Sequence, residues 1–190
     1  MVSNTTGIRD STFLNVNGKD AVYKLVKPLR KIGVPAACIY DFDVIRIDKN
    51  NNVRRKGLWN SLFSAINICE TNRKQLVEHL VKINSFLQNK MGEKVTFGNF
   101  KREILDTNSA ELIDSFIEKL SHYGVFIVPY GELEEWLPCF HYDESWTSNA
   151  LNWIETNDAN VGIDGKNIWE FIQKIKRWVE DPDRLGMQNY

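Results

Sequence analysis

Residues 36–43 read Ala-Ala-Cys-Ile-Tyr-Asp-Phe-Asp, an apolar run that ends in two carboxylates. A short apolar run of this kind predicts a buried strand. Two similar runs, Thr12–Val16 and Val125–Val128, predict further strands. Residues 22–32 have the apolar spacing of a helix, so the chain begins with strand, helix, strand. That order predicts a parallel sheet, because a connection of this length favours a right-handed crossover.

The rest of the chain is predicted to be mainly helical. Apolar residues recur at helical spacing over residues 76–87, 112–120 and 168–179, and a short helix is expected at 146–156. Tryptophans beside isoleucines at this spacing indicate core packing rather than base stacking. The expected fold class is therefore α/β, with a small parallel sheet, helices around it and a helical C-terminal part. The expected domain limits are 1–140, with a helical insertion at about 58–122, and 141–190 for a C-terminal extension.

The composition is that of an ordinary globular protein, with 43% apolar and 26% charged residues in a chain of 190. The N-terminal residues do not resemble a signal peptide, and no apolar run approaches the roughly 18 residues of a membrane span. We therefore expect a cytoplasmic protein without a membrane partner. Three widely spaced cysteines, Cys38, Cys69 and Cys139, fit a reducing compartment.

Charge is unevenly distributed along the chain. Residues 1–60 hold 11 Lys and Arg against 5 Asp, while the net charge of the whole chain is -1. Either these charges lie on solvated faces, or the basic front helps to hold a polyanion beside an acidic metal site.

Residues capable of chemistry follow each predicted strand. Ligands of an open parallel sheet bind beyond the carboxyl ends of its strands, so these residues are expected to converge. Asp41 and Asp43 stand two apart, and in extended backbone their side chains would share a face. Two carboxylates suit Mg²⁺ or Mn²⁺ and phosphoryl chemistry, although a solvated turn is the simpler interpretation.

The other two strand ends offer further ligands. Glu132 and Glu134 follow the last strand and are predicted to join the metal site, unless they only begin a helix at its favourable end. Gly18 and Lys19 lie between the first strand and the first helix, where they can bind phosphate. A glycine in this place also commonly forms a turn.

Taken together, residues 16–22, 39–45 and 129–134 resemble, in order and spacing, the Toprim domain of the OLD (overcoming lysogenization defect) family of ATP-dependent endonucleases. The resemblance covers most of residues 12–137. It implies metal-dependent cleavage of nucleic acid phosphodiesters, with DNA favoured over RNA and an ATPase domain or subunit as partner. It makes Asp41, Asp43 and Glu134 catalytic metal ligands and Glu132 a further ligand. It also matches Lys166 to a lysine that stabilises charge on the phosphate.

One departure from this family concerns the first strand. Toprim domains begin with a strand followed by a glutamate, and residues 1–11 contain no glutamate. The chain is therefore expected to be either the C-terminal piece of a longer ATPase-nuclease or a degenerate relative that has lost part of its active site.

Two other interpretations remain open. Phosphatases of the haloacid-dehalogenase type also place Asp-x-Asp at a strand end, which would make Asp41 the nucleophile and Asp43 the acid/base. A non-enzymatic module that docks on an ATPase would explain the missing glutamate. The nuclease interpretation is favoured, since a scaffold has no reason to gather Asp41, Asp43 and Glu134, whose like charges would repel one another.

Overall fold

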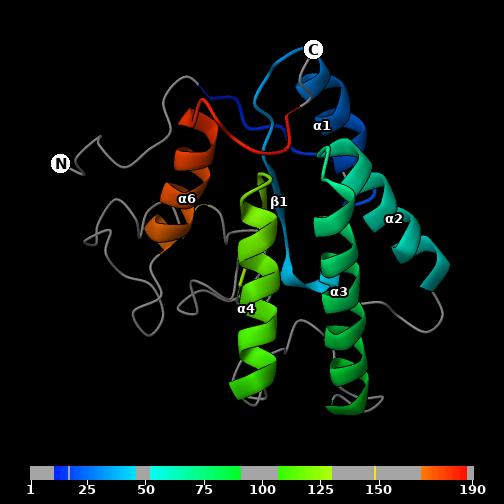
Figure 1. Ribbon diagram of the computed structural model, residues 1–190. Helices are drawn as coiled ribbons and strands as arrows, with labels where there is room; N and C mark the ends of the chain where they lie inside the picture. The colour runs from blue at the N-terminus through cyan, green and yellow to red at the C-terminus, as the bar shows by residue number, and fades with distance from the viewer. Residues whose placement is uncertain are drawn as a thin grey trace.

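The structure is a computed structural model that describes residues 11–16, 18–45, 52–90, 107–129, 148 and 168–187. These residues form a mixed α/β arrangement in which α-helices surround a two-stranded parallel sheet (Figure 1). In the described part of the chain, no helix is long and apolar enough to cross a membrane. The elements are α1 (Val22–Lys31), β1 (Cys38–Tyr40), the 3-10 helix η1 (Phe42–Ile45), α2 (Asn52–Ala65), α3 (Glu70–Lys90), α4 (Thr107–Ser121), β2 (Val125–Ile127) and α6 (Ile168–Glu180).

The sheet confirms two of the three predicted strands. β1 and β2 run parallel, with Cys38 opposite Val125 and Tyr40 opposite Ile127. The backbone N–H of Val128 donates to the carbonyl oxygen of Tyr40 at 2.8 Å, so the pairing extends to the end of β1. Because the strands are parallel and in register, the chain leaves both of them at the same edge of the sheet.

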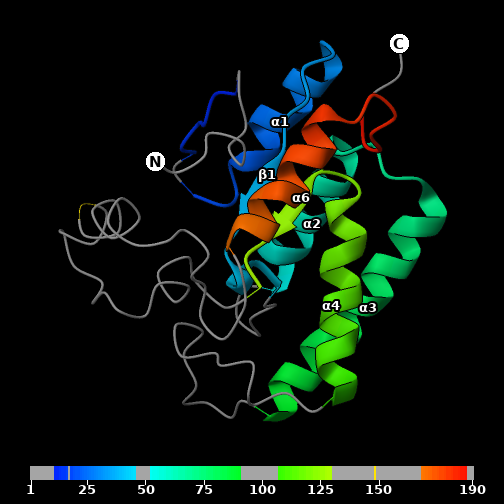
Figure 2. The ribbon, with the colours of Figure 1, turned by 90° about the vertical axis from the view of Figure 1, so that its left-hand side faces the viewer.

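The strand predicted at Thr12–Val16 is wrong. Residues 11–16 have no strand conformation, and Phe13 and Leu14 are 74% and 60% exposed. Figure 2 shows this segment as a dark blue trace that leads into α1. A strand requires hydrogen bonds from a neighbouring strand, and the described sheet consists of β1 and β2, with neither of which residues 11–16 pair. The parallel pair therefore exists, but its second member comes from much later in the sequence.

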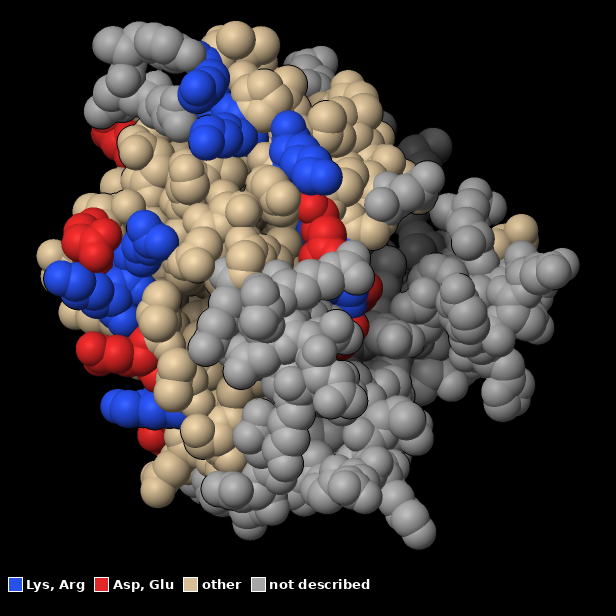
Figure 3. All heavy atoms as spheres, turned by 90° about the vertical axis from the view of Figure 1, so that its right-hand side faces the viewer, with Lys and Arg blue, Asp and Glu red and all other residues tan. Residues whose placement is uncertain are grey.

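Charges of both signs are mixed on the face of the protein that Figure 3 shows. Lys and Arg side chains lie there in small groups, and acidic side chains accompany several of them. The ion pairs of the described surface include Lys74 with Glu70 and Lys176 with Glu180, each with N and O atoms 4.0 Å apart. Exposed pairs of this kind contribute about 0–1 kcal/mol each. On this face, the described basic side chains do not form one continuous surface.

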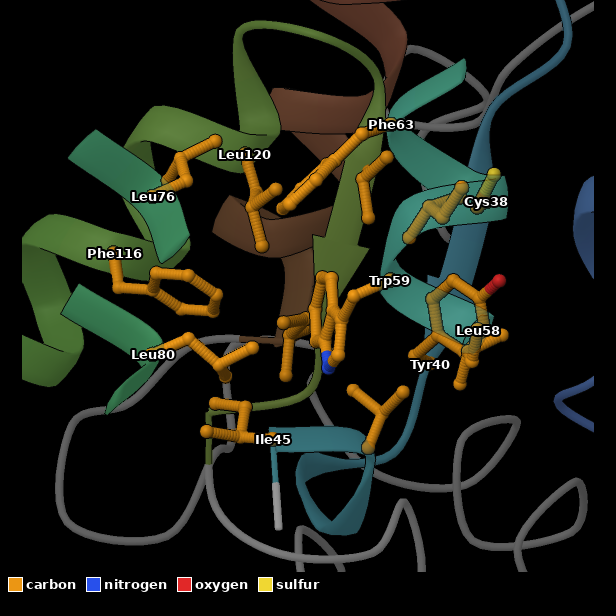
Figure 4. Close-up of a cluster of buried hydrophobic side chains, with 14 of the residues drawn as sticks. Cys38, Tyr40, Ile45, Leu58, Trp59, Phe63, Leu76, Leu80, Phe116 and Leu120 are labelled. Carbon is orange, nitrogen blue, oxygen red and sulfur yellow. The ribbon is translucent and has the colours of Figure 1, made fainter. Parts of the chain in front are cut away.

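The four helices α1, α2, α3 and α4 form one apolar core together with one face of the sheet (Figure 4). Trp59 lies at its centre, with ring centroids 5.5 Å from Phe63 and 5.6 Å from Phe116. From β1, Cys38 and Tyr40 point into the same cluster. The stripes predicted on the middle helices are confirmed as core positions, with Leu76, Leu80, Ile83 and Leu87 buried on α3 and Ile113, Phe116 and Leu120 buried on α4.

The predicted final helix, α6, covers the opposite face of the sheet (Figure 2). Phe126 of β2 packs there against Ile175 and Trp178, and its ring meets Phe171 edge-on at 6.0 Å. Trp178 is only 6% exposed, and its indole N–H is within hydrogen-bonding distance of two backbone carbonyls. The expected packing role of the C-terminal tryptophans is thus confirmed for Trp178. The predicted helix at 146–156 and the predicted boundary at 140 fall outside the described residues, except for helical Ser148.

A fully buried arginine links α1, both strands and the C-terminal segment. Arg30 donates to the carbonyl oxygen of Ala36 from Nε at 2.9 Å and from Nη2 at 2.8 Å. It also donates to Gly186 at 3.0 Å and to Gly124 at 3.4 Å, and it stacks 4.7 Å above the ring of Trp178. Burial lowers the pKa of Arg30 to about 10. A guanidinium in this position holds the residues that precede each strand in place by hydrogen bonds.

Replacing Arg30 should destabilise the fold strongly. Arg30→Met would remove the guanidinium donor from the carbonyls of Ala36 and Gly186, while the carbonyl of Gly124 would keep its bond from the N–H of Cys38, and the loss should cost about 3 kcal/mol or more. Arg177→Met on the exposed side of α6 is the matched control and should change stability by less than about 0.5 kcal/mol. Urea unfolding of the two variants measures both values, and equal midpoints would contradict the bridging role of Arg30.

The turn before β2 requires glycine at residue 124. Gly124 has a φ of +68°, and a Cβ atom there would lie 2.5 Å from the Trp178 ring. Gly124→Ala should therefore cost about 2–4 kcal/mol, from left-handed strain and overpacking. Gly57→Ala is the control, because nothing lies within 4 Å of its Cβ position on α2. That change should stabilise the protein by about 0.5–1 kcal/mol. A similar thermal shift in both variants would refute this account of the turn.

Candidate functional site

The two aspartates predicted as metal ligands lie directly after β1. Asp41 is exposed at the strand end, while Asp43 lies half-buried inside η1. The extended backbone predicted for this pair is wrong, since the N–H of Val44 donates to the carbonyl oxygen of Asp41 at 3.1 Å and closes a turn. The turn forms because Phe42, Val44 and Ile45 are all buried in the core. The carboxylates are therefore placed by a 3-10 turn rather than by the face of a strand.

Asp43 forms an ion pair with a lysine of the same chain. The ammonium of Lys19 donates a hydrogen bond to Oδ2 of Asp43, although the two residues are far apart in sequence. The side chains are 35% and 30% exposed, so the pair is partly shielded from water. The turn before α1 thus lies against the segment that leaves β1.

The backbone around Lys19 explains how its side chain reaches Asp43. Gly18 has a φ of +94°, a conformation that L side chains rarely adopt, and its carbonyl oxygen accepts from Ala21 at 3.0 Å. The turn-forming role of Gly18 is therefore confirmed. The predicted binding of phosphate by Gly18 and Lys19 remains a prediction.

The remaining predicted site residues lie outside the described part of the chain. Pro129 is the last described residue after β2, and Glu132, Glu134 and Lys166 all fall in ranges that the structure does not describe. Within the described ranges there is no group of three or more His, Cys, Asp and Glu that could hold a metal ion. The complete ligand set predicted for Mg²⁺ or Mn²⁺ remains a prediction.

Two ionisable groups on β1 are unsuited to react. Burial raises the pKa of the Cys38 thiol to about 12, partly offset by the charge of Arg30. Burial is also the main reason why the pKa of Tyr40 lies above its usual value, with smaller contributions from Cys38, Asp20 and Tyr23. Both groups stay protonated at neutral pH. The chemistry available at this strand end therefore belongs to the carboxylates and to Lys19.

A pocket of about 310 Å³ lies between α4, α6 and the C-terminal segment, away from Asp41 and Asp43. Glu118 on its wall accepts a hydrogen bond from Lys174 at 2.7 Å and lies 3.6 Å from His122. The hydrogen bond from Lys174 is the main reason why the pKa of Glu118 is lowered. Glu118, Lys174 and His122 thus pair with one another in this pocket. We therefore place the candidate site at the end of β1 and not in this pocket.

The sequence singled out Lys19 but did not predict its ion pair with Asp43. It expected an anion from outside the protein, whereas the structure gives Lys19 the carboxylate of Asp43. Only the predicted convergence of strand ends could have suggested this pair, and no local sequence pattern connects two residues so far apart.

The two described cysteines should differ in reactivity. Cys38 is 1% exposed with a raised thiol pKa, whereas Cys69 is exposed. Native protein treated with iodoacetamide should be modified at Cys69, and Cys38 should react only after denaturant unfolds the core. Peptide mass spectrometry assigns each modification. Rapid labelling of Cys38 under native conditions would contradict the packing of β1.

No family model, no curated protein and no solved structure matches the chain. Any function must therefore be inferred from the residues at the ends of β1 and β2.

Proposed function

We propose that this chain is a metal-dependent nuclease domain of the Toprim type. It would cleave nucleic acid phosphodiesters with Mg²⁺ or Mn²⁺ held by Asp41 and Asp43. Glu132 and Glu134 are the proposed further ligands, and Lys166 the proposed group that stabilises charge on the phosphate. The preferred substrate is DNA, and an ATPase domain or subunit is the proposed partner.

The observation that carries the proposal is the parallel register of β1 and β2. Tyr40 stands opposite Ile127, so the chain leaves β1 just before Asp41 at the same edge of the sheet at which it leaves β2 at Val128. Ligand sites of parallel sheets lie beyond this edge. In an antiparallel pair, the chain would have left the two strands at opposite ends of the sheet.

The pairing of Lys19 with Asp43 supports a cation site at the same edge. The Asp43 carboxylate already binds a positive group, and it stays accessible enough, at 30% exposure, for exchange with an ion from solvent. Carboxylate oxygens are the ligands that Mg²⁺ and Mn²⁺ prefer. The residues present thus fit a hard divalent cation better than a soft one.

The described residues near the end of β1 would have distinct roles in this function. Asp41 and Asp43 would hold the cation, and the turn at Gly18 and Lys19 would bind the phosphate beside it. A bound ion of this kind polarises a phosphoryl oxygen and activates water. Cys38 and Tyr40 would stabilise the strand beneath the site without taking part.

Binding of Mn²⁺ tests the proposal directly. Saturating Mn²⁺ should raise the melting temperature by about 5 °C or more, since a ligand at 100 times its Kd stabilises the folded state by about 2.7 kcal/mol. Asp43→Asn should abolish this shift, because it removes the charge that holds the ion. Asp183→Asn, a change at an exposed aspartate near the C-terminus, should leave the shift intact.

The same proteins distinguish the nuclease from its alternatives. Cleavage of plasmid DNA that depends on Mn²⁺ and is lost in Asp43→Asn is the expected outcome. Hydrolysis of para-nitrophenyl phosphate without DNA cleavage would favour the phosphatase. A melting temperature that Mn²⁺ leaves unchanged in the wild-type protein would refute the metal site and favour an interaction module.

A further inference from the structure

The contact between Lys19 and Asp43 has consequences beyond the location of the site. It joins the turn before α1 to η1, and it is the ion pair that the described residues form at the end of β1. Partly exposed ion pairs contribute little to the stability of a fold. The pair is therefore weak enough to open when a stronger ligand for Asp43 arrives.

An ammonium and a divalent cation compete for the same carboxylate. Two like charges a few ångströms apart near a protein surface repel each other, and the repulsion is doubled when one of them is divalent. Lys19 therefore has to leave Oδ2 of Asp43 before a metal ion can bind there. Its flexible side chain keeps the released ammonium close to the site.

A released lysine beside a bound divalent cation favours an anionic ligand. Phosphate oxygens can contact the metal ion and the ammonium together, and the backbone N–H groups of the turn at Gly18 lie nearby in sequence. On the basis of the proposed function, we propose that Lys19 is an internal counter-ion of Asp43, that a divalent cation displaces it, and that it then binds the substrate phosphate. Metal and phosphate binding are thereby coupled, and the coupling acts equally in both directions.

Calorimetric titration of Mn²⁺ tests the displacement without measuring cleavage. Lys19→Met removes the competing charge and should bind Mn²⁺ with a Kd about tenfold lower than that of the wild-type protein. Lys19→Arg retains the charge and should keep a Kd close to the wild-type value. Lys24→Met is the matched control on the exposed side of α1 and should also leave the Kd unchanged.

A second titration tests the transfer of Lys19 to phosphate. Thymidine 5′-monophosphate, added at saturating Mn²⁺, should bind the wild-type protein about tenfold more tightly than Lys19→Met. Circular dichroism confirms that each variant is folded before its Kd is compared. Equal nucleotide affinities in these two proteins would overturn the proposed transfer.

The outcomes separate this inference from the function on which it rests. Equal Mn²⁺ affinities in the wild-type protein and Lys19→Met would overturn the role of Lys19 but leave the metal site standing. Failure of both proteins to bind Mn²⁺ would overturn the proposed metal-dependent function itself. Tighter Mn²⁺ binding together with weaker nucleotide binding in Lys19→Met would support both.

Discussion

The buried guanidinium of Arg30 is the interaction on which the rest of the structure depends. It binds the carbonyl group of Ala36, which precedes β1, and that of Gly124, which precedes β2. It also binds the carbonyl group of Gly186 in the C-terminal segment. Strands as short as these leave few ladder hydrogen bonds to hold them, and a buried carbonyl without a donor is costly. Arginine suits this task because its planar fork offers several donors while its face stacks on Trp178.

This anchoring bears directly on the candidate site. Arg30 binds the chain where it enters both strands, and the ladder then carries the register to Tyr40 and Ile127. A shift of either strand by one residue would turn its buried side chains to the other face. The hydrogen bonds of Arg30 thus help to hold the strand end from which the 3-10 turn places Asp41 and Asp43. A site at the edge of so small a sheet depends on this rigidity, since ligand groups must stay close to productive geometry.

The sequence predicted the elements whose evidence is local. Helical stripes on α3, α4 and α6 were found because burial repeats along each helix, and β1 and β2 because both are short apolar runs. The run at Thr12–Val16 has the same pattern but no partner strand, and pairing is not a local property. Asp43 was misplaced because the burial of its apolar neighbours turns the chain. Arg30 has the sequence pattern of a surface residue at the end of an amphipathic helix, and only the fold shows that it is buried.

The Lys19–Asp43 ion pair is compatible with the proposed site because it is weak enough to open. A deeply buried pair would resist separation, since opening it leaves an uncompensated charge in a medium of low polarity. A fully exposed pair would have no preferred geometry and would be screened by salt. At about one-third exposure, each group has a fixed partner and also access to water when the contact opens. Intermediate burial of this kind suits a carboxylate that must stay compensated before a cation binds and become available when one does.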